Sequence, residues 1–270
     1  MSASITTDEL ARAGAPRAVD AYRPSFRAWT WRHPEWWVLA LSAAAWLETL
    51  ALISTPSSQG GPAASMAGMA MTASSGAAHA STLGARTLGG WTLMVTTMML
   101  PLTIGPLRAV AERSLWRRRQ RAIGEYLVGF LGVWLLAGVT LLGVRSAFVS
   151  LGWPSARAPT WVLPAGLGLA AAWQLTPYKR RALRACHRAV PLAPSGARAV
   201  RDCVRYGASS ARSCLVSCGI AMVALTLGGA SLAAMLLVAG VVVVECYAIR
   251  PRALVSAGVL ALVAAGALVV

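Results

Sequence analysis

The sequence predicts an all-α fold: a polytopic transmembrane helical bundle of about seven helices, with its N-terminus in the cytoplasm. The apolar residues, 57% of the 270, come in long uninterrupted runs, which is typical of membrane proteins and excludes a soluble core. No segment alternates between polar and apolar residues over about ten positions, so helices are favoured over a β-barrel. The third observation is the distribution of basic residues between the runs, which sets the orientation.

Seven apolar runs approach or reach the roughly 20 residues that a helix needs to cross a hydrocarbon core about 30 Å thick. The fourth and fifth runs are short and contain glycine, proline or polar residues, and the seventh ends with the chain itself, so six crossings remain an alternative. The predicted crossings lie near residues 36–55, 88–109, 122–143, 160–177, 214–229, 231–249 and 253–270.

The net charge of +16 follows the positive-inside rule better than it fits a nucleic-acid-binding face. The Lys and Arg counts alternate between high and low along the connections, which places 22 of the 25 basic residues on the cytoplasmic side, beside anionic lipid headgroups. We therefore expect a multi-pass protein of the bacterial inner or plasma membrane. It would have a partly disordered cytoplasmic tail at 1–33, a transmembrane domain at 34–270 and no nucleic-acid partner.

The first external loop, residues 56–87, contains three methionines and a histidine among alanine, glycine, serine and threonine. This composition offers the methionines no large apolar neighbours to pack against. Thioether sulfur and imidazole both suit Cu(I), so the loop predicts a soft-metal site formed by Met66, Met69, Met71 and His79. The alternative is a low-complexity spacer in which the methionines are incidental.

The second predicted crossing continues the methionine pattern. Met94 and Met98 are four residues apart, and we expect them to share one face of the helix while Met99 points elsewhere. Pro101 predicts a kink just beyond them. A stripe of this kind can equally be packing, so the metal interpretation depends on the neighbouring loop.

The cysteines are expected on the cytoplasmic side, where thiols stay reduced and can bind a soft metal. Cys214 and Cys218 share one face of the fifth predicted crossing, close to the basic cytoplasmic loop 178–213, while Lys179 is expected at the headgroups. Small buried apolar cysteines are the alternative. Structural zinc is disfavoured because no CxxC pair is present. The five cysteines are Cys186, Cys203, Cys214, Cys218 and Cys246.

Four segments resemble one known family: WTLMVTTMMLP (91–101), EYLVGFLGVWL (125–135), WQLTPYKRRALRACH (173–187) and CLVSCGIAM (214–222), followed by Glu245. Together they resemble the domain of unknown function 2182 family, whose members are described as predicted metal-binding integral membrane proteins. The chain departs from the family pattern at Ala182 and Ser217, where the family has cysteines. The resemblance implies metal binding by Met94, Met98, Met99, Cys186, Cys214, Cys218 and Met222.

These observations predict an integral membrane protein that binds or passes a soft transition metal, most simply Cu(I), in metal uptake, handling or delivery. We expect no enzyme activity, since no serine elbow, phosphate loop or zinc-protease helix occurs. Haem and nucleotide are not expected, because the three histidines lie outside the predicted helices. A metallochaperone or a membrane complex would be the partner. The alternatives are a non-catalytic assembly or scaffold subunit of a membrane complex and a transporter of small solutes.

Overall fold

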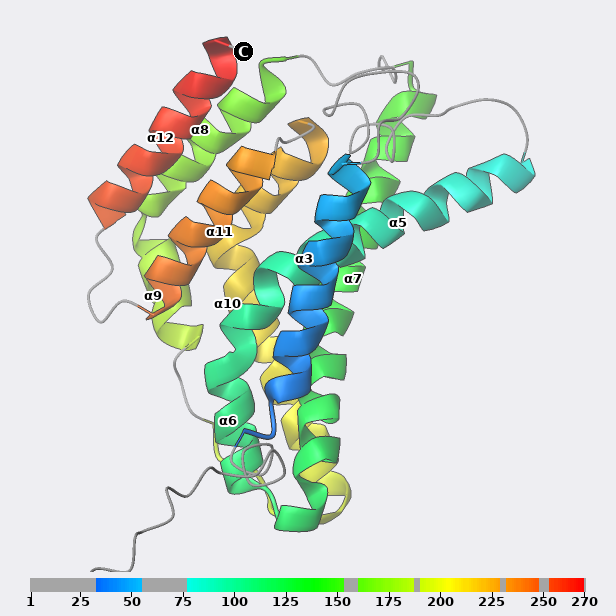
Figure 1. Cartoon of the computed structure of the whole chain (residues 1–270), viewed down its shortest axis with the longest axis vertical. Coiled ribbons are helices and arrows are strands. Elements are labelled where there is room, and N and C mark those ends of the chain that lie inside the picture. The colour runs from blue at the N-terminus through cyan, green and yellow to red at the C-terminus, as the bar shows by residue number, and fades with distance from the viewer. Residues whose placement is uncertain are drawn as a thin grey trace, which may run out of the picture. The chain divides into compact units, whose positions relative to one another are not determined.

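The computed structural model describes residues 33–54, 77–152, 160–186, 190–228, 232–247 and 253–269, and every regular element in those segments is helical (Figure 1). The all-α class is thus confirmed for the described residues. The chain divides into two units, Met1–Pro34 and Glu35–Val270, and the second unit carries all the described helices. They are α3 (Trp36–Ser54), α5 (Ala77–Met99), η1 (Leu100–Thr103), α6 (Ile104–Arg113), η2 (Trp116–Arg118), α7 (Arg119–Ser150), α8 (Val162–Gln174), α9 (Pro177–Cys186), α10 (Gly196–Gly228), α11 (Leu232–Tyr247) and α12 (Ala253–Val269).

Three helical segments are long and apolar enough to cross a membrane: Leu88–Arg113, Trp116–Ser150 and Gly196–Gly228. By length and composition they indicate a multi-pass membrane protein. Four further apolar helices are shorter. At about 1.5 Å per residue, the 13 residues of α8 extend over only about 20 Å, less than the hydrocarbon thickness of about 30 Å. The shorter helices are Trp36–Leu52, Val162–Gln174, Leu232–Tyr247 and Ala253–Ala267, and they coincide with the other four predicted crossings.

The helix that contains the fifth predicted crossing is longer than the sequence indicates, because α10 begins at Gly196 and not near Cys214. The segment expected as a cytoplasmic connection is therefore largely helical. Its buried positions, Ala199, Cys203, Tyr206 and Ser210, follow each other at three- or four-residue intervals, as on one face of a helix. Arginines on the other face lower the mean hydropathy, so a search for apolar runs misses this part of the helix. As a result Cys214 lies in the middle of α10.

Glycines hold α10 directly against α7. A Cβ atom at Gly129 would lie 2.1 Å from the carbonyl oxygen of Val204, and one at Gly207 would lie 2.0 Å from the carbonyl oxygen of Tyr126. No side chain fits at either position, because the obstacle is backbone in both cases. Close approach through small residues is the usual way in which membrane helices pack. This crossing fixes the position of α10 along α7.

The chain changes direction after α5, where the α-helix gives way to the 3₁₀ turn η1 (Figure 1). Pro101 is the cause, because it has no backbone N–H and its ring crowds the carbonyl of Thr97, four residues earlier. The Thr97 oxygen accepts a hydrogen bond from Ser42 Oγ of α3 at 3.4 Å, and Tyr247 Oη donates to the Pro101 oxygen at 3.0 Å. The predicted kink is confirmed, and contacts from α3 and α11 hold it in place.

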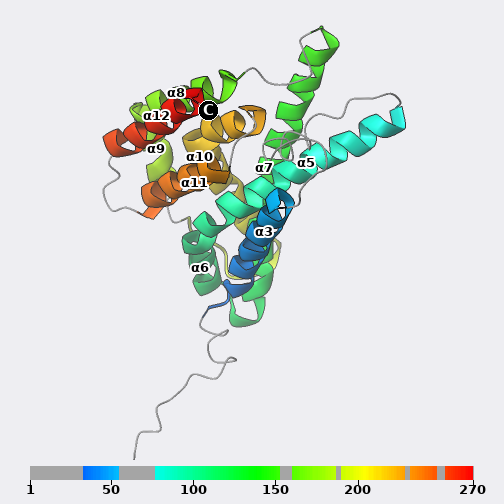
Figure 2. The same cartoon turned by 45° about the horizontal axis from the view of Figure 1, so that its top comes forward.

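Helices α8, α9 and α11 also pack against α10. Helix α12 lies beside α8 in both views of the unit (Figure 2). Helix α8 contacts α10 closely, since a Cβ atom at Gly166 would lie 2.5 Å from the Cβ of Ala224. The centre of α10 is therefore enclosed by α7 and α8, and the end of α5 reaches it as described below.

Candidate metal centre

Three sulfur atoms from two helices meet where the end of α5 reaches the middle of α10. Cys214 Sγ lies 3.5 Å from Met99 Sδ, and Cys218 Sγ lies 3.8 Å from the same Met99 Sδ. The two Sγ atoms are 3.6 Å apart. We call Met99, Cys214 and Cys218 the sulfur triad.

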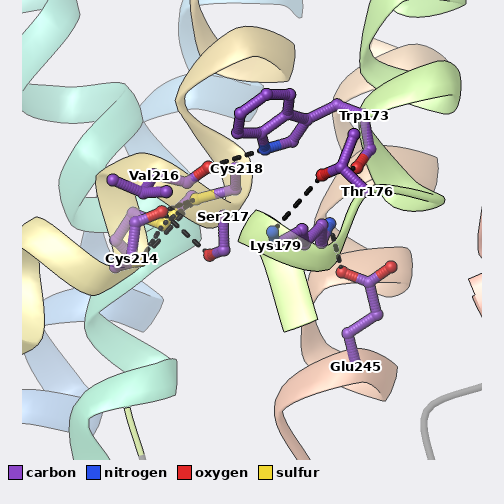
Figure 3. Close-up of polar contacts among 9 residues, drawn as sticks. Trp173, Thr176, Lys179, Cys214, Val216, Ser217, Cys218 and Glu245 are labelled. Carbon is purple, nitrogen blue, oxygen red and sulfur yellow. Dashed lines mark hydrogen bonds and ion pairs between the residues drawn. The ribbon is translucent and has the colours of Figure 1, made fainter. Parts of the chain in front are cut away.

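Local hydrogen bonds fix the two cysteines on one turn of α10 (Figure 3). Cys218 Sγ donates to the Cys214 carbonyl oxygen at 3.0 Å, and Ser217 Oγ donates to the same oxygen at 2.9 Å. Trp173 of α8 donates from Nε1 to the carbonyl oxygen of Val216, at 2.8 Å. The four-residue spacing puts both thiols on one face, and the neighbouring helix holds that turn in place.

The triad is buried. Met99 exposes 0% of its surface, Cys218 4% and Cys214 7%. Among the described cysteines, Cys203, Cys214, Cys218 and Cys246 form no disulfide, so the thiols are available as ligands. Thiolate and thioether sulfur are soft ligands, which favour Cu(I) over hard cations.

The sulfur spacing fits a three-coordinate ion. A triangle with edges of 3.5 to 3.8 Å has its centre about 2.1 Å from each corner, and metal–thiolate bonds are about 2.3 Å long. Opening each edge by about 0.4 Å would give that bond length. A linear ion between the two thiolates would instead need the sulfurs about 4.6 Å apart, about 1 Å more than observed. The geometry therefore favours a site that includes Met99.

The sequence predicts Met94, Met98 and Met99 as candidate ligands and separates Met99 from the face that the other two share. In the structure, Met99 is the one whose sulfur touches both thiols. The reason is that Met99 is the last residue of α5, where the backbone changes to the 3₁₀ turn. Regular α-helical spacing therefore does not describe which face Met99 presents.

The other two helix methionines lie outside the triad. Met98 is buried at 2% exposure. Met94 of α5 lies beside Thr226 of α10, and the Thr226 Oγ1 atom is 3.9 Å from the Met94 sulfur. Met222 is fully buried one turn beyond Cys218. These methionines continue the apolar core in the direction of the external loop expected from the sequence.

Several predicted ligands cannot be placed. Met66, Met69 and Met71 lie outside the described residues. His79 falls within α5 and Cys186 ends α9, but the side chains of both lie outside the described part. The external methionine site and the role of Cys186 therefore stay predictions.

A buried ion pair that the sequence does not predict lies next to the triad. Lys179 Nζ lies 2.7 Å from Glu245 Oε2, and the two side chains are 3% and 4% exposed (Figure 3). The expected headgroup position of Lys179 is thus wrong, because α9 turns this side chain inward to α11. A cavity of about 10 Å³, close to the size of one water, is lined by Lys179, Gln174, Ser217 and Cys218. A lone lysine after Thr-Pro gave no sequence signal of such a partner.

The donor set in the described segments is dominated by sulfur. Within them, no three His, Cys, Asp or Glu side chains come together as they would in a typical zinc site. The triad consists of two thiols and one thioether, which is the donor chemistry of a copper protein.

Comparison with known proteins agrees with this chemistry. Neither a curated protein nor a solved structure matches the chain. A family model described as "PpoB2: Copper chaperone" matches residues 88–269, a segment that includes the whole sulfur triad and begins after the predicted external loop. Copper, in its Cu(I) form, is an ion that thiolate and thioether sulfur suit. The chain therefore belongs to the PpoB2 copper chaperone family.

Proposed function

We propose that the sulfur triad is the site at which this membrane protein holds its Cu(I) cargo. The observation that carries this proposal is the triangle of Met99, Cys214 and Cys218, with edges of 3.5 to 3.8 Å, buried between α5 and α10. Loading replaces the two thiol protons by one Cu(I), so two protons leave and the dithiolate complex carries one negative charge. Because the ligands must lose protons, binding weakens as the pH falls.

We further propose the path that supplies this site. Seven helices cross the bacterial plasma membrane with the N-terminus inside, and Met66, Met69, Met71 and His79 collect Cu(I) in the external loop. Met94 and Met98 lie between that loop and Met99 along the chain, and Met222 lies one turn beyond Cys218 on α10. A cytoplasmic metallochaperone or a membrane complex receives the ion. The domain of unknown function 2182 family, which the sequence resembles, is then the same family under another description.

The test compares copper binding in detergent-purified protein. The double variant Cys214→Ser and Cys218→Ser should lose the Cu(I) that the native chain keeps against a competing chelator. Cys203→Ser is the matched control, since Cys203 is also buried on α10 but lies about three turns before Cys214. X-ray absorption of the native protein should show only sulfur neighbours. Retention of copper by the double variant, or a shell dominated by nitrogen and oxygen, would contradict the proposal.

A further inference from the structure

A second cavity lies against the sulfur triad. Its volume is about 240 Å³, and its wall includes Thr103 of η1, Gly105 of α6, Cys214 of α10 and Cys246 of α11. Cys214 is the one member of the triad that lines this cavity, because Met99 and Cys218 do not belong to its wall. The cavity therefore touches the proposed copper site through a single thiol.

The cavity also brings a second thiol to that side. Cys246 is partly exposed at the end of α11, whereas Cys214 is 7% exposed. The following residue, Tyr247, donates from its hydroxyl to the Pro101 oxygen, which ties this end of α11 to the turn that places Met99. Two thiols thus line one cavity from two helices, and a hydrogen bond links the Cys246 segment to the backbone at Pro101, two residues after Met99.

We propose that this cavity is a thiol-exchange chamber, through which Cu(I) passes between a small thiol and the triad, with Cys246 as the intermediate ligand. The inference rests on the proposed copper function of the triad. The volume of about 240 Å³ is smaller than the roughly 300 to 1,000 Å³ of typical pockets for larger ligands. A short thiol chain carrying Cu(I) fits this space, whereas a folded domain does not enter it.

The exchange balances without any redox step. Cys246 forms a bond to the Cu(I) of the incoming bis-thiolate complex, one external thiolate leaves, and it takes the proton of Cys246. Cys214 then replaces the second external thiolate in the same way, and its proton leaves on that thiol. Finally Cys218 displaces Cys246, to which it passes its proton. The ion remains Cu(I), two small thiols are released, and Cys246 is regenerated as a thiol while Met99 completes the triad.

The shared position of Cys214 explains why exchange can proceed in steps. Cu(I) moves between soft ligands through associative exchange, in which the new sulfur binds before the old one leaves. Cys214, which belongs to both the chamber and the triad, holds the ion while Cys218 replaces Cys246. The triad alone, with Cys218 and Met99 turned away from the cavity, would present no second thiol to an incoming complex.

The test measures the rate of copper transfer from a Cu(I)–glutathione complex to the full-length protein in detergent, followed by the ultraviolet absorbance of the copper–thiolate product. Cys246→Ser should slow transfer by about tenfold or more. The final copper content should stay unchanged, because Cys246 is regenerated and does not hold the ion at the end. Gly105→Leu narrows the cavity at an exposed wall position and should slow transfer as well.

Gly132→Leu is the matched control for Gly105→Leu. Both glycines are exposed helical positions where an added Cβ meets no atom within 4 Å, but Gly132 lies on α7 away from the cavity wall. It should transfer copper at the native rate. A native rate in Cys246→Ser with full copper content would overturn the exchange chamber, and this variant decides alone if Gly105→Leu does not fold. Absence of copper from the native protein at equilibrium would instead overturn the triad itself.

Discussion

Replacing Met99 by leucine tests the choice that the structure makes between two adjacent buried methionines. Met98 and Met99 are 2% and 0% exposed, so burial does not distinguish them. Only Met99 of the two places its sulfur within 3.8 Å of both Cys214 and Cys218 in the described structure. Met98→Leu is therefore the matched control. A difference between the two variants in copper binding reports the thioether contact and not the loss of a buried methionine.

The expected magnitudes separate stability from binding. Leucine conserves the volume of methionine, so each variant should lose less than about 1.5 kcal/mol of unfolding free energy. Without the thioether, Cu(I) must be held by two thiolates that are 3.6 Å apart, about 1 Å closer than a linear geometry needs. Loss of a supporting group at a metal site typically costs about 10- to 100-fold in affinity, and we expect Met99→Leu to lose at least that much.

The assay is competition for Cu(I) against a chelator of known affinity, with X-ray absorption on the loaded proteins. Met99→Leu should show about two sulfur neighbours in place of three, whereas Met98→Leu should match the native protein. Thermal unfolding of both variants in detergent controls for misfolding. Equal affinities and equal sulfur shells in the two variants would refute the assignment of Met99 as a ligand.

Three further outcomes are expected. Gly207→Ala should lower the unfolding temperature in detergent, because its Cβ would lie 2.0 Å from a carbonyl oxygen of α7 and overpacking costs about 1–3 kcal/mol or more. Gly132→Ala should leave the unfolding temperature unchanged, because nothing lies within 4 Å of a Cβ atom there. Lys179→Met should destabilise the protein by about 3–5 kcal/mol, while the double variant with Glu245→Leu should cost much less, and equal losses would argue against a buried pair. A cysteine introduced at Ser57 should react with an impermeant maleimide in intact cells; reaction only after lysis would reverse the proposed orientation.

The fold class and the metal type are local properties of the chain, which is why the sequence predicts them. Uninterrupted apolar runs identify membrane helices without knowledge of their partners. The softness of sulfur predicts copper from the residue types alone, and the family match agrees. The pairing of Cys214 with Cys218 is equally local, because a four-residue spacing on a helix puts two side chains on one face.

The amphipathic first half of α10 shows where hydropathy fails. Arginines on its outer face conceal a buried face, so hydropathy places the start of this helix near Cys214, whereas α10 begins at Gly196. This error moves the cysteines from the middle of a helix to its end. It also hides the contact between α10 and α7, which depends on two glycines whose importance appears only once the helices are placed together.

The sequence by itself determined a helical membrane protein with soft-metal ligands, because hydropathy and ligand softness belong to each residue. Only the tertiary structure brings the sulfur of Met99 into contact with both Cys214 and Cys218. It likewise decided that Lys179 is buried against Glu245. These pairings depend on the register between helices. Pro101 and the glycine contacts of α10 set that register. A register between segments that are far apart in the sequence leaves no periodic signal in either segment.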